Sequence, residues 1–538
     1  MNMDEQPAIG ARTSEPLRLA ILLERDQQPA WIGAMIERVK ALAFIEICLV
    51  ILQPQPAGSN TSSLLWSLYR RADDRLFGKA ADTLASTDIS ALLTGIARIE
   101  INQEVGEAKK LVQHSIDVLL DTRPGGTPDP FAEIARFGVW RYEFGDTRLP
   151  DLSAVGRREV ADRAPLTVSR LVSHLRGGEI VCLYQSQART VPFSPRRNRD
   201  NTLWKCVAFT SRALAALHQS QSIPKKLDCA SQAKFDEQAS VNIPALLART
   251  GTRLLGRALQ KMFFLEQWFI AFKFDVDTIP PHSFADFEPI APPSDRFWAD
   301  PFPIERDGRY YIFIEELPFA SNKGHISVLE VHPDGTWTQP VKVLERDYHL
   351  SYPFLFEWEG ALFMLPESGH NRSVEVYRCH HFPDDWRLEA VLLEDLRCAD
   401  ATMAQIADRW WMFVNIAEKG TELYDELHIY HAEQPFGPWT PHNNNPVKSD
   451  ARSARPAGNF FWHDGLLYRP AQCCVPLYGS ALSLNVVDRL TTDEFVEHQV
   501  VRCAPDWRPR LLGLHTFNRA GRLSVIDCLQ QAPKIGAR

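Results

Sequence analysis

Polar residues that could bind or transform a sugar recur at equivalent places in the C-terminal half of this 538-residue sequence. Five short segments each place one such residue about seven positions before a turn. In chain order these residues are Asp300, Tyr352, Asp400, Arg455 and His515. The second strands of the same units end near four further candidates, which are Glu316, Glu367, Arg469 and Gln472. Carboxylates accept hydrogen bonds from sugar hydroxyls and transfer protons, so this set predicts a sugar site.

A repeated turn, followed by an aromatic or aliphatic strand, places these residues. The second turn residue of each unit is residue 308, 360, 409, 465 or 521, so the period is about 50 residues. That period, with about four short strands per unit, is typical of an all-β propeller, and five units predict a five-bladed β-propeller over residues 263–538. Gln267–Phe274 is expected to complete the last blade. Because the innermost strands line a propeller's channel, the five residues should converge in one funnel.

Residues 17–220 have the pattern of an α/β domain, behind a polar tail (1–16) that is expected to be disordered. Leu17–Glu24 and Ile45–Leu52 are near-continuous apolar runs that predict buried strands, and Pro29–Leu42 has helical spacing. The alternation of such strands and helices predicts a Rossmann-like parallel sheet covered on both faces. The chain is therefore multidomain, with this domain preceding the propeller.

Residues 221–262 are predicted to link the two domains. The second half of this linker forms a helix in which Arg249, Arg253, Arg257 and Lys261 recur every four residues. Residues with this spacing share one helix face. The basic stripe has two interpretations: a peripheral contact with an anionic membrane surface, or a solvated face on a connecting helix, which we favour.

The C-terminal repeats carry motifs that resemble a known family. FWADPF, SYPFLFEWEG, LPESG, RPAGNFFWHDGLLYRPAQ and HTFN resemble the N-terminal propeller of plant glucosamine inositolphosphorylceramide transferases. The repeats also resemble the five-bladed propellers of arabinanases, β-xylosidases, invertases and levansucrases. In those hydrolases a blade-one aspartate is base or nucleophile, a blade-three aspartate orients the system and a blade-four glutamate is the acid.

This resemblance implies roles for three carboxylates. Asp300 matches the base or nucleophile and Asp400 matches the orienting aspartate, but Arg455 stands where the acid is expected. Glu367 of the second unit is therefore the candidate acid. Glycoside hydrolysis normally needs two carboxyl groups across the scissile bond. We accordingly favour a transferase over a hydrolase.

The α/β domain carries a second resemblance. FGVWRYEFGD (137–146) and LTVSRLVSHLRGGEIV (166–181) resemble segments of formyltransferases that use 10-formyltetrahydrofolate. That family transfers the formyl group with an asparagine, a histidine and an aspartate. The matching positions here are Arg141, Glu143 and Arg176, so the resemblance implies a retained fold with lost folate chemistry. The sequence requires no cofactor, and 10-formyltetrahydrofolate enters only if this domain is active.

Composition and motif content argue against several other functions. A net charge of -8 disfavours nucleic-acid binding, no spaced ligand motif indicates a metal, and no run of about 18 apolar residues supports a transmembrane helix. We expect a cytoplasmic protein, or one peripheral to the inner membrane, that binds a sugar or sugar nucleotide in envelope glycan or glycolipid synthesis. The alternatives are a formyl or acyl transferase on an amino sugar, with the propeller as its substrate-binding module, and a non-catalytic glycan-binding scaffold.

Overall fold

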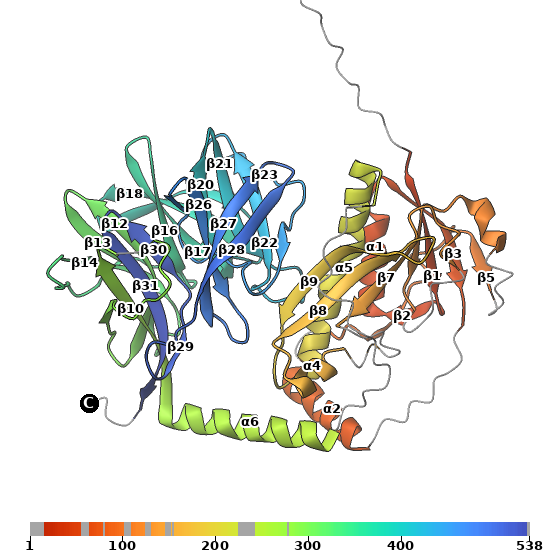
Figure 1. Ribbon diagram of the computed structural model, residues 1–538, viewed down its shortest axis with the longest axis horizontal. Helices are drawn as coiled ribbons and strands as arrows, with labels where there is room; N and C mark the ends of the chain where they lie inside the picture. The colour runs from red at the N-terminus through yellow and green to blue at the C-terminus, as the bar shows by residue number, and fades with distance from the viewer. Residues whose placement is uncertain are drawn as a thin grey trace, which may run out of the picture.

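The chain forms an N-terminal α/β domain and a C-terminal β-propeller, joined by a long helix that runs beneath both (Figure 1). The computed structural model describes residues 15–54, 64–78, 81–101, 109–123, 131–145, 152, 155–223, 243–276 and 279–534. Residues 1–14 of the predicted tail and 224–242 of the predicted linker lie outside the described residues.

A seven-stranded sheet in the order β5-β3-β1-β6-β7-β8-β9 forms the α/β domain. Its strands are β1 (Leu17–Leu23), β3 (Ile45–Leu52), β5 (Arg98–Glu100), β6 (Val118–Asp121), β7 (Val139–Phe144), β8 (Leu166–His174) and β9 (Ile180–Arg189). The first five strands in this order run parallel, but β8 is antiparallel to both of its neighbours. The sheet is thus mixed: the predicted parallel pairing is confirmed for five strands but not for β8 and β9, and the Rossmann-like fold is not confirmed. Gly177 and Gly178, with φ of 87° and 86°, make the tight β8–β9 turn.

Alternate side chains of the central strands pack on opposite faces of this sheet. Leu19 and Ile21 of β1 pack with the helices of one face, while Ala20 and Leu22 belong to the core of the other face. A two-stranded sheet of β2 and β4 flanks the domain. The remaining elements are β2 (Gln27–Pro29), α1 (Ala30–Lys40), α2 (Leu64–Phe77), β4 (Ser86–Asp88), η1 (Lys109–His114), α4 (Arg157–Asp162) and α5 (Pro195–Ser220).

Five antiparallel sheets make the propeller, as the repeats predict. Blade one comprises β12 (Arg296–Arg306), β13 (Arg309–Pro318), β14 (His325–Val331) and β15 (Val341–Leu344). Blade two comprises β16 (Ser351–Trp358), β17 (Ala361–Ser368), η4 (Gly369–Asn371), β18 (Ser373–His381) and β19 (Asp385–Leu393). Blade three comprises β20 (Cys398–Ile406), β21 (Arg409–Ile416), β22 (Glu426–Ala432), β23 (Thr440–Pro441) and β24 (Lys448–Ser449). Blade four comprises β25 (Phe461–His463), β26 (Leu466–Cys473), β27 (Ala481–Leu490) and β28 (Phe495–Cys503).

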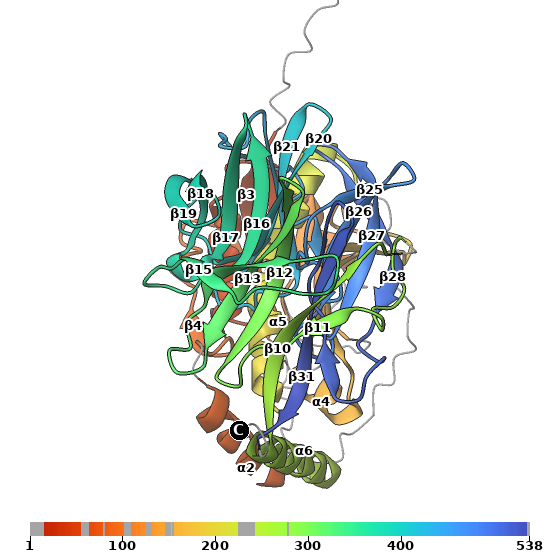
Figure 2. The same cartoon turned by 90° about the vertical axis from the view of Figure 1, so that its left-hand side faces the viewer.

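The last blade combines both ends of the propeller sequence. It comprises β10 (Phe264–Phe274), β11 (Glu288–Ile290), β29 (Leu511–Gly513), β30 (Phe517–Ala520) and β31 (Leu523–Pro533). Strand β10 pairs with β31 along its whole length, so the prediction that Gln267–Phe274 completes the last blade is confirmed. This pairing closes the ring (Figure 2).

The helix α6 (Ile243–Phe263) leads from the α/β domain into β10. Among the described residues, no helix combines the length and the apolar character needed to span a bilayer.

Buried ion pairs fasten the two domains together. Lys205 of α5 lies 2.8 Å from Asp425, in the loop between β21 and β22, and both side chains are almost fully buried. Arg212, two turns further along α5, binds Glu426 at the start of β22, also at 2.8 Å. Ala451 of the propeller donates a backbone hydrogen bond to Gln187 of β9. The α/β domain therefore contacts the propeller through the β21–β22 loop, the start of β22 and the segment from Ser449 to Ala451.

Candidate sugar-binding site

The first three blades bend their inner strands at the same position. Asp300, Tyr352 and Asp400 have φ values of 49°, 46° and 52°, in the left-handed region that residues other than glycine rarely adopt. The pairing register of β12, β16 and β20 shifts at each of these residues. Such a bulge turns a side chain out of the regular alternation and is common beside functional sites. The bulges bring the three side chains to the centre of the propeller, as the sequence predicts.

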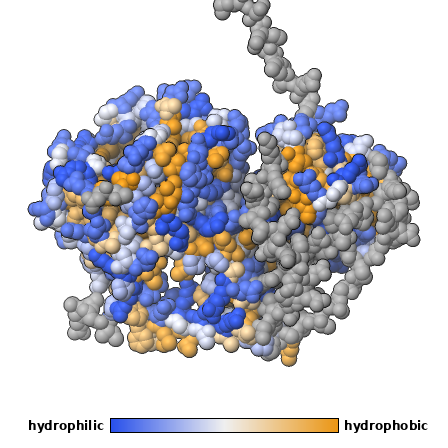
Figure 3. Space-filling view, in the orientation of Figure 1, coloured by the Kyte–Doolittle hydropathy of each residue, from blue (hydrophilic) through white to orange (hydrophobic). Residues whose placement is uncertain are grey.

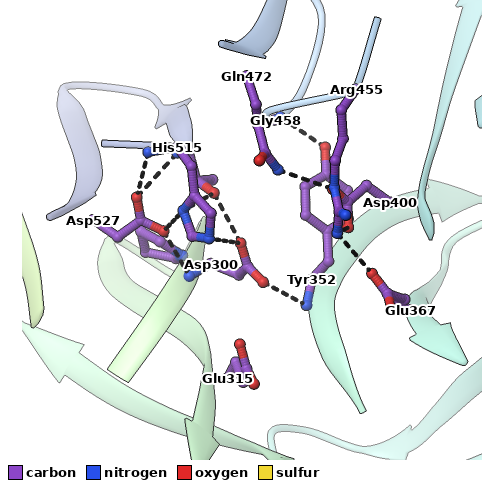
Figure 4. A network of polar contacts seen from close by, with 12 residues as sticks. Asp300, Glu315, Tyr352, Glu367, Asp400, Arg455, Gly458, Gln472, His515 and Asp527 are labelled. Carbon is purple, nitrogen blue, oxygen red and sulfur yellow. Dashed lines mark hydrogen bonds and ion pairs between the residues drawn. The ribbon is translucent and has the colours of Figure 1, made fainter. Parts of the chain in front are cut away.

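Asp300 stands at the centre of one half of this central cluster (Figure 4). Its carboxylate accepts hydrogen bonds from the Thr516 hydroxyl at 2.9 Å and from the Tyr352 backbone N–H at 3.2 Å. His515 Nε2 lies 3.7 Å from the same carboxylate, and His515 Nδ1 lies 2.5 Å from Asp527. Asp527 in turn accepts backbone hydrogen bonds from Asp300, His515 and Thr516. The residues around Asp300 are thus fixed by further hydrogen bonds, chiefly to Asp527.

Arg455 connects the carboxylates of the other half. Its Nε lies 2.5 Å from Asp400 Oδ2, and its Nη2 lies 3.2 Å from Asp400 Oδ1 and 3.3 Å from Glu367. The backbone carbonyl of Leu423 accepts a further bond from Arg455 at 3.1 Å, and Gln472 donates to Asp400 at 3.0 Å. Asp400 is almost fully buried, whereas the Glu367 side chain is 18% exposed. Glu367 is therefore the carboxylate of this half that a ligand can reach.

Tyr352 is fully buried between the two halves. Its hydroxyl bonds the Thr402 hydroxyl at 2.8 Å and accepts the Gly458 backbone N–H at 2.7 Å. Tyr352 was predicted to bind substrate, but a buried side chain with these partners is placed to support the cluster instead.

Two predicted substrate-binding residues lie away from the centre. Arg469 is buried against Glu497 of β28 at 2.6 Å, so its guanidinium stabilises blade four. Glu316 accepts bonds from Arg296, Trp298, His325 and Ser327. Its neighbour Glu315 lies beside Asp300 instead (Figure 4) and pairs with His349 at 3.1 Å. Since successive strand residues point to opposite faces, Glu315 and Glu316 cannot both face the centre. The structure therefore does not bring Arg469 and Glu316 into the central cluster, and their predicted role in substrate binding stays a prediction.

Two aromatic residues that sequence reasoning missed lie beside the cluster. The Trp268 ring stacks on His515 with centroids 4.0 Å apart. Tyr478 meets His515 edge-on at 5.3 Å and lies 5.0 Å from the Arg455 guanidinium, so it contacts both halves. Both rings are half-buried. Their exposed parts offer the apolar surface that the C–H face of a sugar needs. Trp268 was noticed only as part of the closing strand, and no repeat position signals Tyr478.

Burial and neighbouring charges give the central groups unusual proton affinities. Burial raises the pKa of Asp300 to about 7, against the attraction of His515. Burial and the nearby Asp400 carboxylate raise the pKa of Glu367 well above its ordinary value. Burial opposes the charged form of His515, but Asp527 and Asp300 outweigh it and raise the pKa of His515 to about 9. At neutral pH the site thus holds a cationic His515 and an Asp300 close to its titration point, beside a Glu367 whose raised pKa favours its protonated form.

The raised pKa of His515 predicts how stability changes with pH. A histidine whose pKa is higher in the folded state stabilises the protein fully below its unfolded pKa of about 6.5. This stabilisation is lost as the pH rises towards 9. Asp300, whose pKa is raised in the folded state, destabilises the protein increasingly as the pH rises from about 4 to 7, so its effect falls in a lower pH range than that of His515. We expect His515→Gln to flatten the fall in unfolding free energy between pH 6.5 and 9, measured by urea denaturation. His380→Gln, at an exposed histidine, should keep the wild-type slope, and an unchanged slope in His515→Gln would contradict the assignment.

The ligand atoms of Asp300, His515 and Asp527 lie close enough together to hold a metal ion. Asp527 already accepts three backbone N–H groups, and the His515 ring is held between two carboxylates. These contacts suit a protonated histidine better than a metal-bound one, because a metal ligand must be deprotonated.

The positions that match formyltransferases are differently placed. Arg141 is buried and lies 3.4 Å from Asp121, so its guanidinium is already paired. Arg176 is exposed in the β8–β9 turn, where it donates to the backbone carbonyl of Glu133. Glu143 is half-buried on β7. That these three positions have lost the folate chemistry of formyltransferases stays a prediction.

A cavity of about 250 Å³ opens elsewhere in the α/β domain, beyond the carboxyl ends of β1 and β6. Arg25, Gln28, Thr122 and Arg123 are among its lining residues. The strand order reverses between β1 and β6, and ligands of α/β sheets bind at such points.

Comparison with known proteins links the propeller to one family. The model of the N-terminal region of glucosamine inositolphosphorylceramide transferase 1 matches residues 283–507. Proteins of that name are 35% identical over 205 residues in Oryza sativa subsp. japonica and 31% identical over 208 residues in Arabidopsis thaliana. These matches cover 37% and 38% of this chain, and 27% of each relative. The chain thus matches about a quarter of the length of these curated relatives.

Solved structures that resemble the chain at low scores include two glycoside hydrolases. A family 117 enzyme of Zobellia galactanivorans is 14% identical with a TM-score of 0.32, covering 49% of this chain and 90% of its own. A GH43_1 enzyme of Xanthomonas citri, complexed with xylose, is 13% identical with a TM-score of 0.31, covering 45% and 90%. The assignment of a five-bladed propeller rests on the strand pairing of this chain itself.

Proposed function

We propose that the protein binds a sugar at the central cluster of its propeller and acts in the synthesis of a glycan or glycolipid. The observation that carries this proposal is the convergence of Asp300, Glu367, Asp400, Arg455 and His515, from all five blades, beside partly exposed aromatic rings. The family match over residues 283–507 supports it, because that range includes four of the five residues.

The geometry supports a division of roles among these side chains. Asp300 is the base, because it sits near its titration point and keeps acceptor capacity for a sugar hydroxyl. Glu367 is the acid, because its carboxyl is partly exposed and its raised pKa favours the protonated form. Asp400 fixes Arg455, and Arg455 in turn positions Glu367. His515 holds Asp300 within reach of two aromatic rings.

The substrate class follows from the relatives, whose name joins glucosamine to an inositol phosphate lipid. We accordingly propose a sugar joined to an inositol phosphate lipid as the ligand of this site. Formation of a glycosidic bond fits the cluster better than hydrolysis, because Arg455 stands at the position expected for a hydrolytic acid. The activity of the full-length relatives stays a proposal for this chain.

Glucosaminyl-inositol phosphate, a soluble probe, tests this assignment by calorimetric titration and mass spectrometry. We expect Glu367→Gln to bind the probe within about threefold of the wild type, because the amide donates as the protonated carboxyl does. With a glucosamine nucleotide as donor and inositol phosphate as acceptor, transfer of glucosamine with release of the nucleotide should slow by about 10²- to 10⁴-fold, because a general acid is lost, and hydrolysis of the probe by water should slow likewise. Glu389→Gln, on the outer strand of the same blade, should match the wild type in both assays.

The outcomes separate the competing functions. A wild type that does not bind the probe contradicts the proposal. Binding with no bond formed or broken by the wild type supports the glycan-binding scaffold instead. Stabilisation by 10-formyltetrahydrofolate alone supports the formyl or acyl transferase, for which the cavity beside Arg123 is the available ligand site.

A further inference from the structure

The helices α2 and α6 expose apolar side chains at one end of the molecule, beneath both domains. Leu64, Leu68 and Leu76 of α2 and Leu255, Leu259 and Met262 of α6 are all exposed, with Leu64 at 77% and Leu255 and Met262 at 62%. Figure 2 shows the two helices side by side at this end, and Figure 3 shows apolar surface along the same edge. An exposed apolar patch of this kind marks an interaction site.

These side chains are not the ones that attach the helices to the domain. Trp66 of α2 and Leu246 of α6 are buried together with Val160 and Ala161 of α4. The exposed leucines lie on other faces of the same helices. Spacings of four residues place Leu64 with Leu68, and Leu255 with Leu259, on continuous apolar stripes. Each helix thus packs one apolar face against the protein. A second apolar face is exposed and is not covered by any of the described residues.

Three of the basic side chains of α6 contact the α/β domain. Arg249 donates to the backbone carbonyl of Ala161, and Arg253 donates to that of Pro192. The Arg257 guanidinium lies 4.6 Å from the Phe193 ring. Each of these three arginines thus makes one contact with the α/β domain. Arg249, Arg257 and Lys261 nevertheless remain exposed, so the basic stripe still presents charge to solvent beside the exposed leucines.

Positive charge nevertheless surrounds the apolar surface. The helix α6 contains Arg249, Arg253, Arg257 and Lys261 and no acidic residue, although the chain as a whole carries a charge of -8. Arg70, Arg71 and Arg75 are exposed on α2. Apolar side chains flanked by cations complement a bilayer whose headgroups are anionic.

We infer that α2 and α6 together form a surface that docks on an anionic lipid bilayer. Leu64, Leu68, Leu255 and Leu259 enter the boundary between headgroups and acyl chains, while the flanking cations meet the lipid phosphates. The inference goes beyond the proposed function, because it concerns a surface at the end of the molecule and needs no ligand in the propeller.

Co-sedimentation with vesicles tests this surface. We expect the full chain to sediment with vesicles of phosphatidylcholine and phosphatidylserine, and much less with phosphatidylcholine alone. Leu255→Ser combined with Leu259→Ser should weaken this binding at least tenfold. Leu388→Ser combined with Val391→Ser removes two exposed apolar side chains of 51% and 41% exposure from β19 and should bind as the wild type does.

Three results would overturn the inference. These are a wild type that does not sediment with anionic vesicles, an α6 double variant that sediments as well as the wild type, and a wild type that dimerises through this face without lipid. Sedimentation velocity identifies the dimer, since the α6 variant would then be a monomer. Binding of glucosaminyl-inositol phosphate should be the same in wild type and α6 variant, so a failure here is distinct from a failure of the proposed function.

Discussion

Replacing Asp300 by asparagine is expected to weaken binding of glucosaminyl-inositol phosphate by about 10- to 100-fold without unfolding the propeller. Hydrogen bonds to a charged group contribute about 1.5–3 kcal/mol, and the amide lacks that charge. The fold should survive because asparagine matches both neighbours of the carboxylate. Its carbonyl oxygen accepts the Tyr352 N–H, and its amide donates to Thr516, whose hydroxyl can turn to accept.

Calorimetric titration gives the affinity, and the melting temperature without ligand reports on the fold. Asp408→Asn is the matched control, because this exposed aspartate lies at the opposite end of the β20–β21 hairpin from Asp400. If wild type, Asp300→Asn and Asp408→Asn bound the probe with equal affinity, Asp300 would not be part of the binding site. If Asp300→Asn lost affinity and its melting temperature also fell strongly, Asp300 would stabilise the fold rather than bind the ligand.

Replacing Lys205 by methionine is expected to cost about 3–5 kcal/mol of stability, because it leaves the Asp425 carboxylate buried without its cation. Burial already raises the pKa of Asp425 even beside Lys205. Asp425 belongs to the loop that carries Leu423, whose carbonyl binds Arg455. Disturbing this loop should therefore also weaken sugar binding, although Lys205 belongs to the other domain.

Scanning calorimetry measures the first effect and titration with glucosaminyl-inositol phosphate the second. Combining Lys205→Met with Asp425→Leu should restore most of the melting temperature, because the uncompensated charge is gone. Arg197→Met, which removes a partly exposed ion pair with Glu422 from the same helix and loop, should cost less than about 1 kcal/mol. If Lys205→Met were no worse than Arg197→Met, the buried pair would not fasten the domains.

The sequence predicted the propeller and its centre because both depend on repetition. A turn followed by an aromatic or aliphatic strand recurs in all five units, and in the first three units the aligned residue before the turn lies at a bulge of the inner strand. Asp300, Tyr352 and Asp400 meet for that reason. In the α/β domain the hydrophobic pattern predicted the buried strands β1 and β3. It did not reveal that β8 runs antiparallel, because an apolar run does not encode its direction.

The sequence did not predict the position of a side chain where that position depends on strand register or on a partner far away in the chain. Glu315 and Glu316 are adjacent, and only the pairing of β12 with β13 determines which of them faces the centre. Arg469 forms an ion pair with Glu497, which lies on another strand of the same blade, so its guanidinium is already paired. Trp268 reaches His515 because the first strand of the propeller sequence belongs to the last blade. The residues next to these positions in the sequence do not indicate any of these contacts.

A crystal structure of the protein with glucosaminyl-inositol phosphate tests the central claim most directly. The account predicts the glucosamine ring beside Trp268 or Tyr478, with its hydroxyl groups within hydrogen-bond distance of Asp300, Glu367 and Arg455. A probe bound instead in the cavity beyond β1 and β6, beside Arg25 and Arg123, would contradict it and move the function to the α/β domain.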